Sequence, residues 1–249
     1  MKKNILLIVI CLSVGFGTSL YAEDGVIKIV VLGSSTAAGS GPINTANAWV
    51  NQFRSYVQSV NASSEVINLA VGGYTTYHIM PSIFTSPTDR PSPDPLHNIT
   101  KALSYYPDAI IINLPTNDAS SGYTVTEQLS NYKQVLTLAA AQKVPVYVST
   151  TQPRNLSTDL RQNLIAVRDS TVKKLGKYAI DFWTDIANAD GTINPLYDMG
   201  DAFDAFSYNL SPLCNLIHLY LVSFSSYDMG GAFDAFPYNL NPSYNLIHP

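Results

Sequence analysis

The feature that most constrains the fold is a regular alternation of short apolar runs with longer segments of helical spacing. Runs rich in valine and isoleucine predict strands at residues 27–32, 65–69, 109–114, 144–149 and 179–183. Apolar residues at helical spacing predict helices at residues 46–60, 125–142 and 156–175. Because the strands are continuous apolar runs, we expect both of their faces to be buried, as in a parallel sheet covered by helices. The pattern predicts an α/β fold of three layers with an open parallel sheet.

The length and composition of the chain fit one large domain. It has 249 residues, of which 46% are hydrophobic and 13% are charged, so the chain is too apolar to be disordered. We assign residues 23–200 to this domain. Lys2 and Lys3 precede a short apolar stretch that leads to Ala22, which is typical of a secretory signal peptide over residues 1–22. A membrane anchor is the alternative for this segment, but we expect cleavage, a secreted or periplasmic protein and no membrane span afterwards.

Charge and cysteine content exclude some function classes. The formal net charge is −4, and lysine and arginine are scattered rather than gathered in a patch, so a nucleic-acid partner is not expected. After cleavage at residue 22 only Cys214 remains, and no intramolecular disulfide can form. The sequence also has no cluster of metal-ligating residues at a known spacing.

The loops that follow the first three predicted strands are expected to face one crevice, because ligands of open parallel sheets bind beyond the carboxyl ends of the strands. The loops are Gly-Ser-Ser-Thr-Ala-Ala-Gly at residues 33–39, Ala-Val-Gly-Gly-Tyr-Thr-Thr at 70–76 and Pro-Thr-Asn-Asp at 115–118.

The first of these loops has three interpretations. It lacks the Gly-Lys-Ser/Thr ending of a Walker loop and the glycine spacing of a dinucleotide fold. It could be a plain turn, or a hydroxyl-rich cradle for a flavin phosphate. The third interpretation is a serine nucleophile, exposed by a glycine-flexible turn beside N–H groups that receive an oxyanion.

The other two loops favour the serine nucleophile. Acyl transfer through serine needs hydrogen-bond donors where negative charge develops, and a glycine N–H and an asparagine amide are suited to this. Gly73 and Asn117 supply these groups. Each residue alone is typical of a turn or a cap, but together with the serine loop they predict one site.

These loops resemble the motifs of the SGNH, or GDSL-type, family of serine esterases and lipases. Residues 33–39 resemble Gly-Asp-Ser-x-x-x-Gly with Ser34 in place of aspartate, residues 68–73 resemble Asn-x-x-x-x-Gly, and residues 115–118 resemble Gly-x-Asn-Asp with proline in place of glycine. The resemblance covers about residues 26–200. It implies a flavodoxin-like three-layer α/β/α sandwich, no cofactor and no metal. It also implies that Ser35 is the nucleophile and that Ser35 N–H, Gly73 N–H and the Asn117 side chain form the oxyanion hole.

The fourth motif of the family, Asp-x-x-His near the chain end, is disrupted. A serine esterase uses this histidine as general base and the carboxylate to orient it. The approach at residues 193–200 makes Asp201 the aspartate, but Asp204 stands where histidine is expected.

A duplicated tail, residues 201–249, follows this disruption. Residues 197–219 recur as residues 227–249, with 17 of 23 positions identical. Two copies at the end of an α/β domain indicate a tandem duplication rather than a solenoid. Each copy ends in Asn-Leu-Ile-His, which makes His218 and His248 the candidate bases. For either histidine, the alternative is a tail residue without a catalytic role.

Two further histidines and one arginine lie near the predicted site loops or a predicted helix start. His78 follows Gly73 closely and is expected to be a hydrogen-bonded structural residue rather than a catalytic one, and His97 is expected to face solvent at the start of a helix. Arg154 follows the fourth strand at the same edge, where it could contact an anionic or sugar substrate or cap a helix.

The sequence therefore predicts a secreted serine hydrolase that cleaves acyl esters of carbohydrates or lipids through an acyl-serine intermediate. Its partner would be a small-molecule or polysaccharide acyl ester, with deacetylation of a polysaccharide as one example. The alternative is a catalytically impaired relative that binds an acyl or glycan ligand, because the Asp-x-x-His motif is disrupted.

Overall fold

Five parallel strands form a single sheet in the computed structural model, which describes residues 26–42 and 44–195. The strands are β1 (Lys28–Gly33), β2 (Glu65–Asn68), β3 (Ala109–Asn113), β4 (Val146–Ser149) and β5 (Ala179–Ile180). Their order across the sheet is β2-β1-β3-β4-β5. All four neighbouring pairs are parallel. The predicted open parallel sheet is confirmed, and all five predicted strands are present.

Helices connect the strands. They are α1 (Ser35–Ala38), α2 (Trp49–Val60), α3 (Ile99–Leu103), α4 (Asn117–Ser120), α5 (Val125–Ala141) and α6 (Thr158–Leu175), with 3-10 turns η1 (Thr45–Asn47) and η2 (Gly176–Tyr178). The three predicted helices are confirmed as α2, α5 and α6. Two of the loops predicted to carry the site differ from expectation, because α1 and α4 are single helical turns that begin at Ser35 and Asn117.

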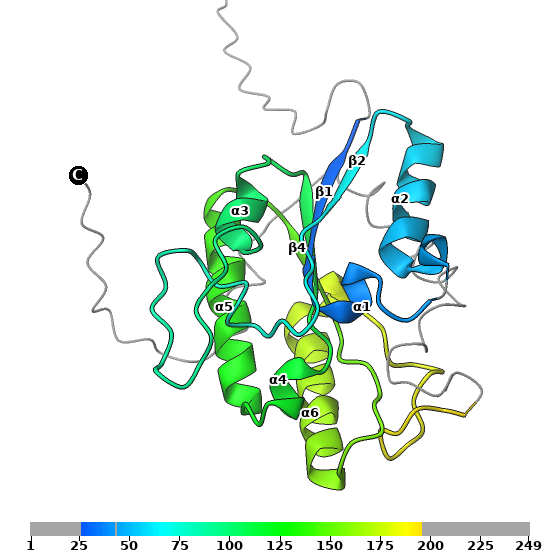
Figure 1. Cartoon of the computed structure of the whole chain (residues 1–249), viewed down its shortest axis with the longest axis vertical. Helices are drawn as coiled ribbons and strands as arrows, with labels where there is room; N and C mark the ends of the chain where they lie inside the picture. Colours follow the sequence, from blue (N-terminus) through cyan, green and yellow to red (C-terminus); the bar gives the residue numbers. More distant parts are fainter. Residues whose placement is uncertain (1–25, 43, 196–249) are drawn as a thin grey trace, which may run out of the picture.

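The helices cover both faces of the sheet. In Figure 1, α2 lies on one side of the sheet, and α3 and α5 lie on the other. Helix α6 packs beside α5 and against β4 and β5. This is the three-layer α/β/α arrangement of the flavodoxin-like type, and the predicted fold class is confirmed.

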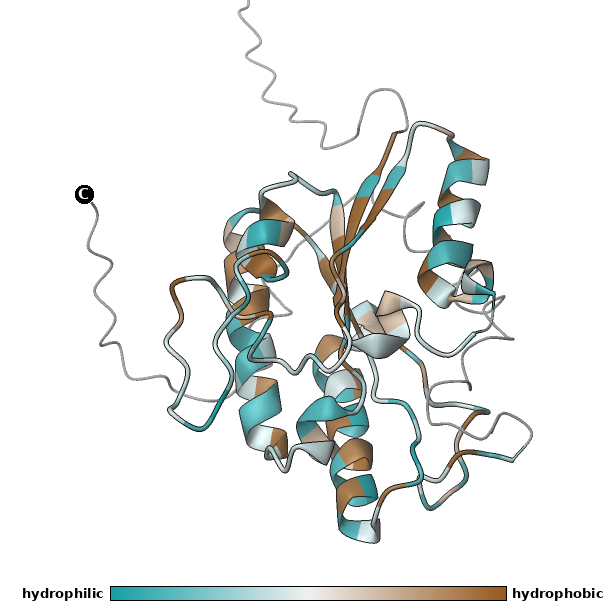
Figure 2. Ribbon diagram, viewed as in Figure 1, coloured by the Kyte–Doolittle hydropathy of each residue, from teal (hydrophilic) through white to brown (hydrophobic). Residues whose placement is uncertain are grey.

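The core lies between the sheet and these helices. The strand residues Val30, Leu32, Ile110 and Ile112 are completely buried. Figure 2 shows the strands as the most hydrophobic part of the fold, whereas the helices carry both hydrophobic and hydrophilic residues. Burial on both faces explains why the strands read as continuous apolar runs.

Local capping sets several element boundaries. Helix α5 begins with a capping box, in which the Thr124 side chain accepts from the Glu127 N–H and the Glu127 carboxylate accepts from the Thr124 N–H. Strand β5 is shorter than predicted because the Asp181 carboxylate accepts from the N–H groups of Trp183 and Thr184, which turns the chain away from the sheet. Among the residues that the structure describes, no helix has the length and apolarity to cross a membrane.

The register places the carboxyl ends of the first three strands together. Gly33 at the end of β1 pairs with Asn113 at the end of β3, and Val31 pairs with Asn68 at the end of β2. The loops that follow these strands therefore start side by side, as expected for one crevice.

Candidate active site

Ser35 lies at the point where β1 ends and the chain turns into α1. A Cβ at Gly33 would lie 2.6 Å from the Ala37 Cβ and 2.8 Å from the Asn113 carbonyl oxygen, so only glycine fits there. The next N–H, that of Ser34, donates to the same Asn113 oxygen at 3.0 Å. This packing buries Ser34 and Thr36 and leaves Ser35 half-buried at the sheet edge.

The hydroxyl and the N–H of Ser35 have no partner within the described ranges, residues 26–42 and 44–195. There its hydroxyl makes no hydrogen bond and its N–H has no acceptor, while its carbonyl accepts from the N–H groups of Gly39 and Ser40. The turn is thus held through its carbonyl, and the hydroxyl and N–H are left for a ligand.

The loop after β2 passes directly beside this turn. A Cβ at Gly72 would lie 3.9 Å from the Ser35 Cβ. The Asn68 amide donates to the Ala37 carbonyl at 2.8 Å, which ties α1 to the start of this loop. Gly73 has a φ of +84°, a conformation that favours glycine. In the part of the chain described, its N–H has no acceptor.

Asn117, the first residue of α4, reaches the same loop. Its side-chain Nδ2 donates to the Tyr74 carbonyl at 2.9 Å. The amide carries two N–H groups, so one remains available for an oxyanion. The structure therefore brings Ser35, Gly73 and Asn117 to the ends of three adjacent strands.

Neither described histidine hydrogen-bonds Ser35. The His78 Nδ1 accepts from the Thr75 N–H at 3.0 Å, which requires the neutral ring to carry its proton on Nε2. The His78 ring stacks on Tyr74, and burial lowers its pKa. His78 is therefore hydrogen-bonded as predicted, and in this tautomer it has no free nitrogen to take a proton.

His97 differs from its prediction. It is half-buried rather than solvent-facing, and its Nδ1 donates to the Leu69 carbonyl at 3.0 Å. The long loop between β2 and α3 folds back over the end of β2, and this covers the ring.

Two residues after β4 also reach the site loops. The Arg154 Nη1 donates to the Thr116 hydroxyl, next to Asn117, at 3.3 Å. The Thr36 hydroxyl, next to Ser35, donates to the Gln152 side chain at 3.4 Å. The expectation that Arg154 lies at the same edge of the sheet is confirmed.

Asp118 is a buried acid at this edge with a large shift of its carboxyl pKa. It is completely buried, and its carboxylate accepts from the N–H and the hydroxyl of Thr76. Burial raises its pKa to about 7, although the hydrogen bonds from Thr76 oppose the shift. No local pattern in the sequence predicts this contact, because it joins residues far apart in the chain. Only the adjacency of Asp118 to Asn117 pointed to it.

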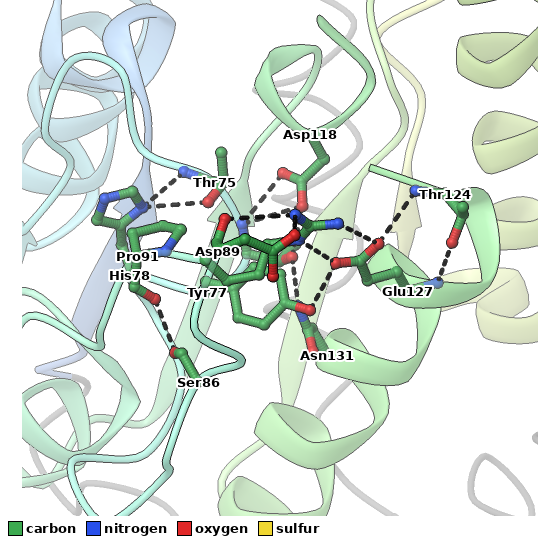
Figure 3. A network of polar contacts seen from close by, with 12 residues as sticks. Thr75, Tyr77, His78, Ser86, Asp89, Pro91, Asp118, Thr124, Glu127 and Asn131 are labelled. Atoms are coloured by element: carbon green, nitrogen blue, oxygen red, sulfur yellow. Dashed lines mark hydrogen bonds and ion pairs between the residues drawn. The ribbon is translucent and has the colours of Figure 1, made fainter. Parts of the chain in front are cut away.

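A second polar network fastens the long loop between β2 and α3 to helix α5 (Figure 3). Glu127 accepts from the Tyr77 hydroxyl at 2.6 Å and forms an ion pair with Arg90 at 2.5 Å. The Arg90 guanidinium also lies 4.2 Å from the centre of the Tyr123 ring. Gly73 belongs to the same loop, so the network anchors the segment that follows it to α5.

Replacing Glu127 by glutamine should destabilise the protein at neutral pH by about 1 kcal/mol. The hydrogen bond from Arg90 lowers the pKa of Glu127 below its ordinary value of 4.5. A carboxyl with a lowered folded-state pKa stabilises the fold above its unfolded value, and that contribution is lost as the pH falls through the folded-state value. The difference in melting temperature between the parent and E127Q should therefore be largest above pH 4.5 and shrink in acid.

Glu65→Gln is the matched control, because Glu65 forms an exposed ion pair with Lys28 at 3.9 Å. Its melting temperature should follow that of the parent at every pH. Equal behaviour of E127Q and E65Q would contradict the assigned role of Glu127.

Several predicted features lie outside the described residues. These are the signal peptide over residues 1–22, Asp201, His218, His248 and the duplicated tail. Within residues 26–42 and 44–195, no group of histidine, cysteine, aspartate and glutamate side chains is arranged to hold a metal ion.

The chain and its fold match known proteins. A family model described as "GDSL-like Lipase/Acylhydrolase family" matches residues 31–219. A search of curated proteins found no match.

Solved structures with the same fold include a G-D-S-L family protein from Desulfitobacterium hafniense DCB-2, with a TM-score of 0.55 and 16% identity over 76% of this chain and 99% of that one. The esterase EstA from Pseudoalteromonas sp. has a TM-score of 0.51 and 16% identity over 79% of this chain and 99% of that one. A two-domain esterase active on acetylated mannans has a TM-score of 0.51 and 14% identity over 88% of this chain and 53% of that one.

Proposed function

Because the chain belongs to the GDSL-like lipase/acylhydrolase family, we propose that it is a secreted serine hydrolase that cleaves acyl esters through an acyl-enzyme intermediate on Ser35. Hydrolysis of acyl esters is the general reaction of this family. One observation carries the assignment of Ser35: its hydroxyl and N–H are unpaired within the described residues, and they lie beside Gly72, in the loop to which Asn117 is hydrogen-bonded.

The proposed mechanism starts with attack of the Ser35 Oγ on the acyl carbonyl carbon, while a base takes the hydroxyl proton. The carbonyl oxygen becomes an oxyanion and accepts hydrogen bonds from the Ser35 N–H, the Gly73 N–H and the second Nδ2–H of Asn117. Collapse of the intermediate breaks the ester bond, and the alcohol leaves with the proton held by the base. Water then attacks the acyl-serine in the same way and releases the acid.

The base in this proposal is His218 or His248, with Asp201 as the acid of the family's Asp-x-x-His motif. His78 is a poor candidate because its Nδ1 is occupied by the Thr75 N–H. In both tail copies the residue three positions before the histidine is asparagine. An asparagine can orient the ring but does not stabilise the imidazolium, and in serine proteases the equivalent change costs about 10⁴-fold in rate.

The proposed substrates are acyl, including acetyl, esters of carbohydrates or lipids. Arg154 supports a polar substrate, because it lies beside Thr116 at the edge of the site. The two-domain esterase with the same fold acts on acetylated mannans, which makes an acetylated polysaccharide a substrate to test first. Secretion rests on the signal-peptide pattern of residues 1–22.

The second candidate function is an impaired hydrolase that binds an acyl or glycan ligand. One observation favours it: Asp204 stands where the family's histidine is expected. Such a protein would keep the oxyanion donors but would lack a base for Ser35.

Reaction with an activated phosphonate ester tests the proposal. Ethyl p-nitrophenyl methylphosphonate should release one equivalent of p-nitrophenol, and peptide mapping by mass spectrometry should place the phosphonyl group on Ser35. His218→Ala and His248→Ala should identify the base, since loss of the base slows labelling. Labelling of a different residue would overturn the Ser35 assignment. Binding of acetylated glycan without labelling of Ser35 would support the second candidate.

A further inference from the structure

Two hydrogen-bonded bridges join the loop after β2 to the loop after β3. In the first, the Asn117 Nδ2 donates to the Tyr74 carbonyl at 2.9 Å. In the second, the Thr76 N–H donates to the Asp118 Oδ2 at 3.0 Å, and the Thr76 hydroxyl donates to Oδ1 at 2.5 Å. The two bridges use alternate residues of one loop and consecutive residues of the other, so they form a ladder between the loops.

The second bridge is shielded from water. Asp118 and Thr76 are both completely buried, and Thr76 Oγ1 also accepts from the Asn131 Nδ2 of α5 at 2.9 Å. Figure 3 shows Asp118 and Asn131 in one network of polar contacts. Because solvent does not compete there, the bridge is a firmer constraint than the half-exposed contact of Asn117.

We propose that Asp118 is a positioning residue, which sets the distance between the Gly73 N–H and the Asn117 amide by holding Thr76. This inference rests on the proposed function, because it assigns these two groups as oxyanion donors. Gly73 lies three residues before Thr76, and Asn117 directly precedes Asp118, so a shift of the bridge moves both donors. Asp118 itself touches neither Ser35 nor the substrate in this role.

The bridge needs a carboxylate rather than a side-chain amide. Thr76 presents two donors, its N–H and its hydroxyl. The N–H donates to both carboxylate oxygens of Asp118, at 3.2 Å to Oδ1 and 3.0 Å to Oδ2. In Asp118→Asn, the Nδ2 would take the place of one oxygen and would bring an N–H donor against the donors of Thr76. The substitution preserves volume but makes part of the contact repulsive.

The ionisation of Asp118 affects the bridge. Burial raises its pKa to about 7, and the negative charge of Glu127 adds to the shift. The other titratable groups that interact with Asp118 are Tyr123 and Tyr132, whose pKa values are raised mainly by burial and in addition by the charge of Asp118. At pH 8.5 the carboxylate is the main form, so variants are best compared there.

Hydrolysis of p-nitrophenyl acetate at pH 8.5 tests the role through four variants. Asp118→Asn should lower kcat on the order of 10²-fold with little change in KM, because a small displacement of the donors weakens transition-state binding. Thr76→Val, which loses the hydroxyl, should lower kcat about 5-fold. Thr76→Ser keeps the hydroxyl and should recover most of the activity that Thr76→Val loses. Asp169→Asn, on the exposed face of α6, is the control for loss of one charge.

A magnetic resonance measurement tests the coupling without hydrolysis. In the Ser35→Ala protein, the Gly73 backbone amide and the Asn117 side-chain amide should shift together with a midpoint near pH 7, and Asp118→Asn should abolish that shift. Parental kcat in D118N, or amides that titrate equally with and without Asp118, would overturn the inference. If the parent shows no hydrolysis that depends on Ser35, the proposed function fails, and the amide titration still decides the role of Asp118.

Discussion

Ser35→Ala is expected to lower the hydrolysis of p-nitrophenyl acetate on the order of 10⁴-fold. The proposed reaction needs an oxygen nucleophile at the end of β1, and Ser34 and Thr36 on either side are buried by the close packing of Gly33. Neither neighbour can take over the attack without opening the turn. The loss should appear in kcat, because alanine removes the covalent step and leaves the donors in place.

Ser40→Ala is the matched control for this prediction. Ser40 lies just beyond α1, its side chain is exposed, and only its backbone contacts Ser35, through an N–H donated to the Ser35 carbonyl at 2.9 Å. The variant should keep parental kcat and KM. Activity that persists in S35A would show that the nucleophile lies elsewhere.

Asn117→Ala is expected to lower kcat by about 10²- to 10³-fold, the usual cost of removing one oxyanion donor. The second Nδ2–H of Asn117 is the group that would meet the oxyanion, so its loss acts on the transition state and leaves KM nearly unchanged. The substitution also removes the bond to the Tyr74 carbonyl. Circular dichroism and the melting temperature should show that the fold is retained.

Asn117→Asp separates these two effects. It preserves side-chain size, removes both donors and places a negative charge beside the developing oxyanion. Its kcat should therefore fall at least as far as that of N117A. A variant N117D with parental kcat would contradict the role of Asn117 in stabilising the oxyanion.

The positions of the strands and long helices could be predicted from the sequence. Strands such as β1 and β3 are buried on both faces, so nearly every residue in them must be apolar, and that requirement is visible without a structure. The carboxyl ends of parallel strands lie at one edge, so it could be predicted from the sequence that the loops of Ser35, Gly73 and Asn117 lie at the same edge of the sheet.

The details of the site depended on contacts between distant residues. The single helical turns α1 and α4 were expected as loops, because one turn is too short to show an apolar periodicity in the sequence. The environment of His97 was predicted wrongly, because its burial depends on how the long loop folds over Leu69. The ion pair of Arg90 with Glu127 left no local pattern for the same reason.

The sequence by itself determined the α/β architecture and the placement of the three loops of the proposed site at one edge of the sheet, since apolar burial and strand direction are properties of short segments. Only the tertiary structure decided that Asp118 holds Thr76 and that His78 carries its proton on the nitrogen away from Thr75. Hydrogen bonds of this kind need donors and acceptors at about 3 Å. Spacing along the chain does not fix such distances, because packing of the loops against the sheet sets them.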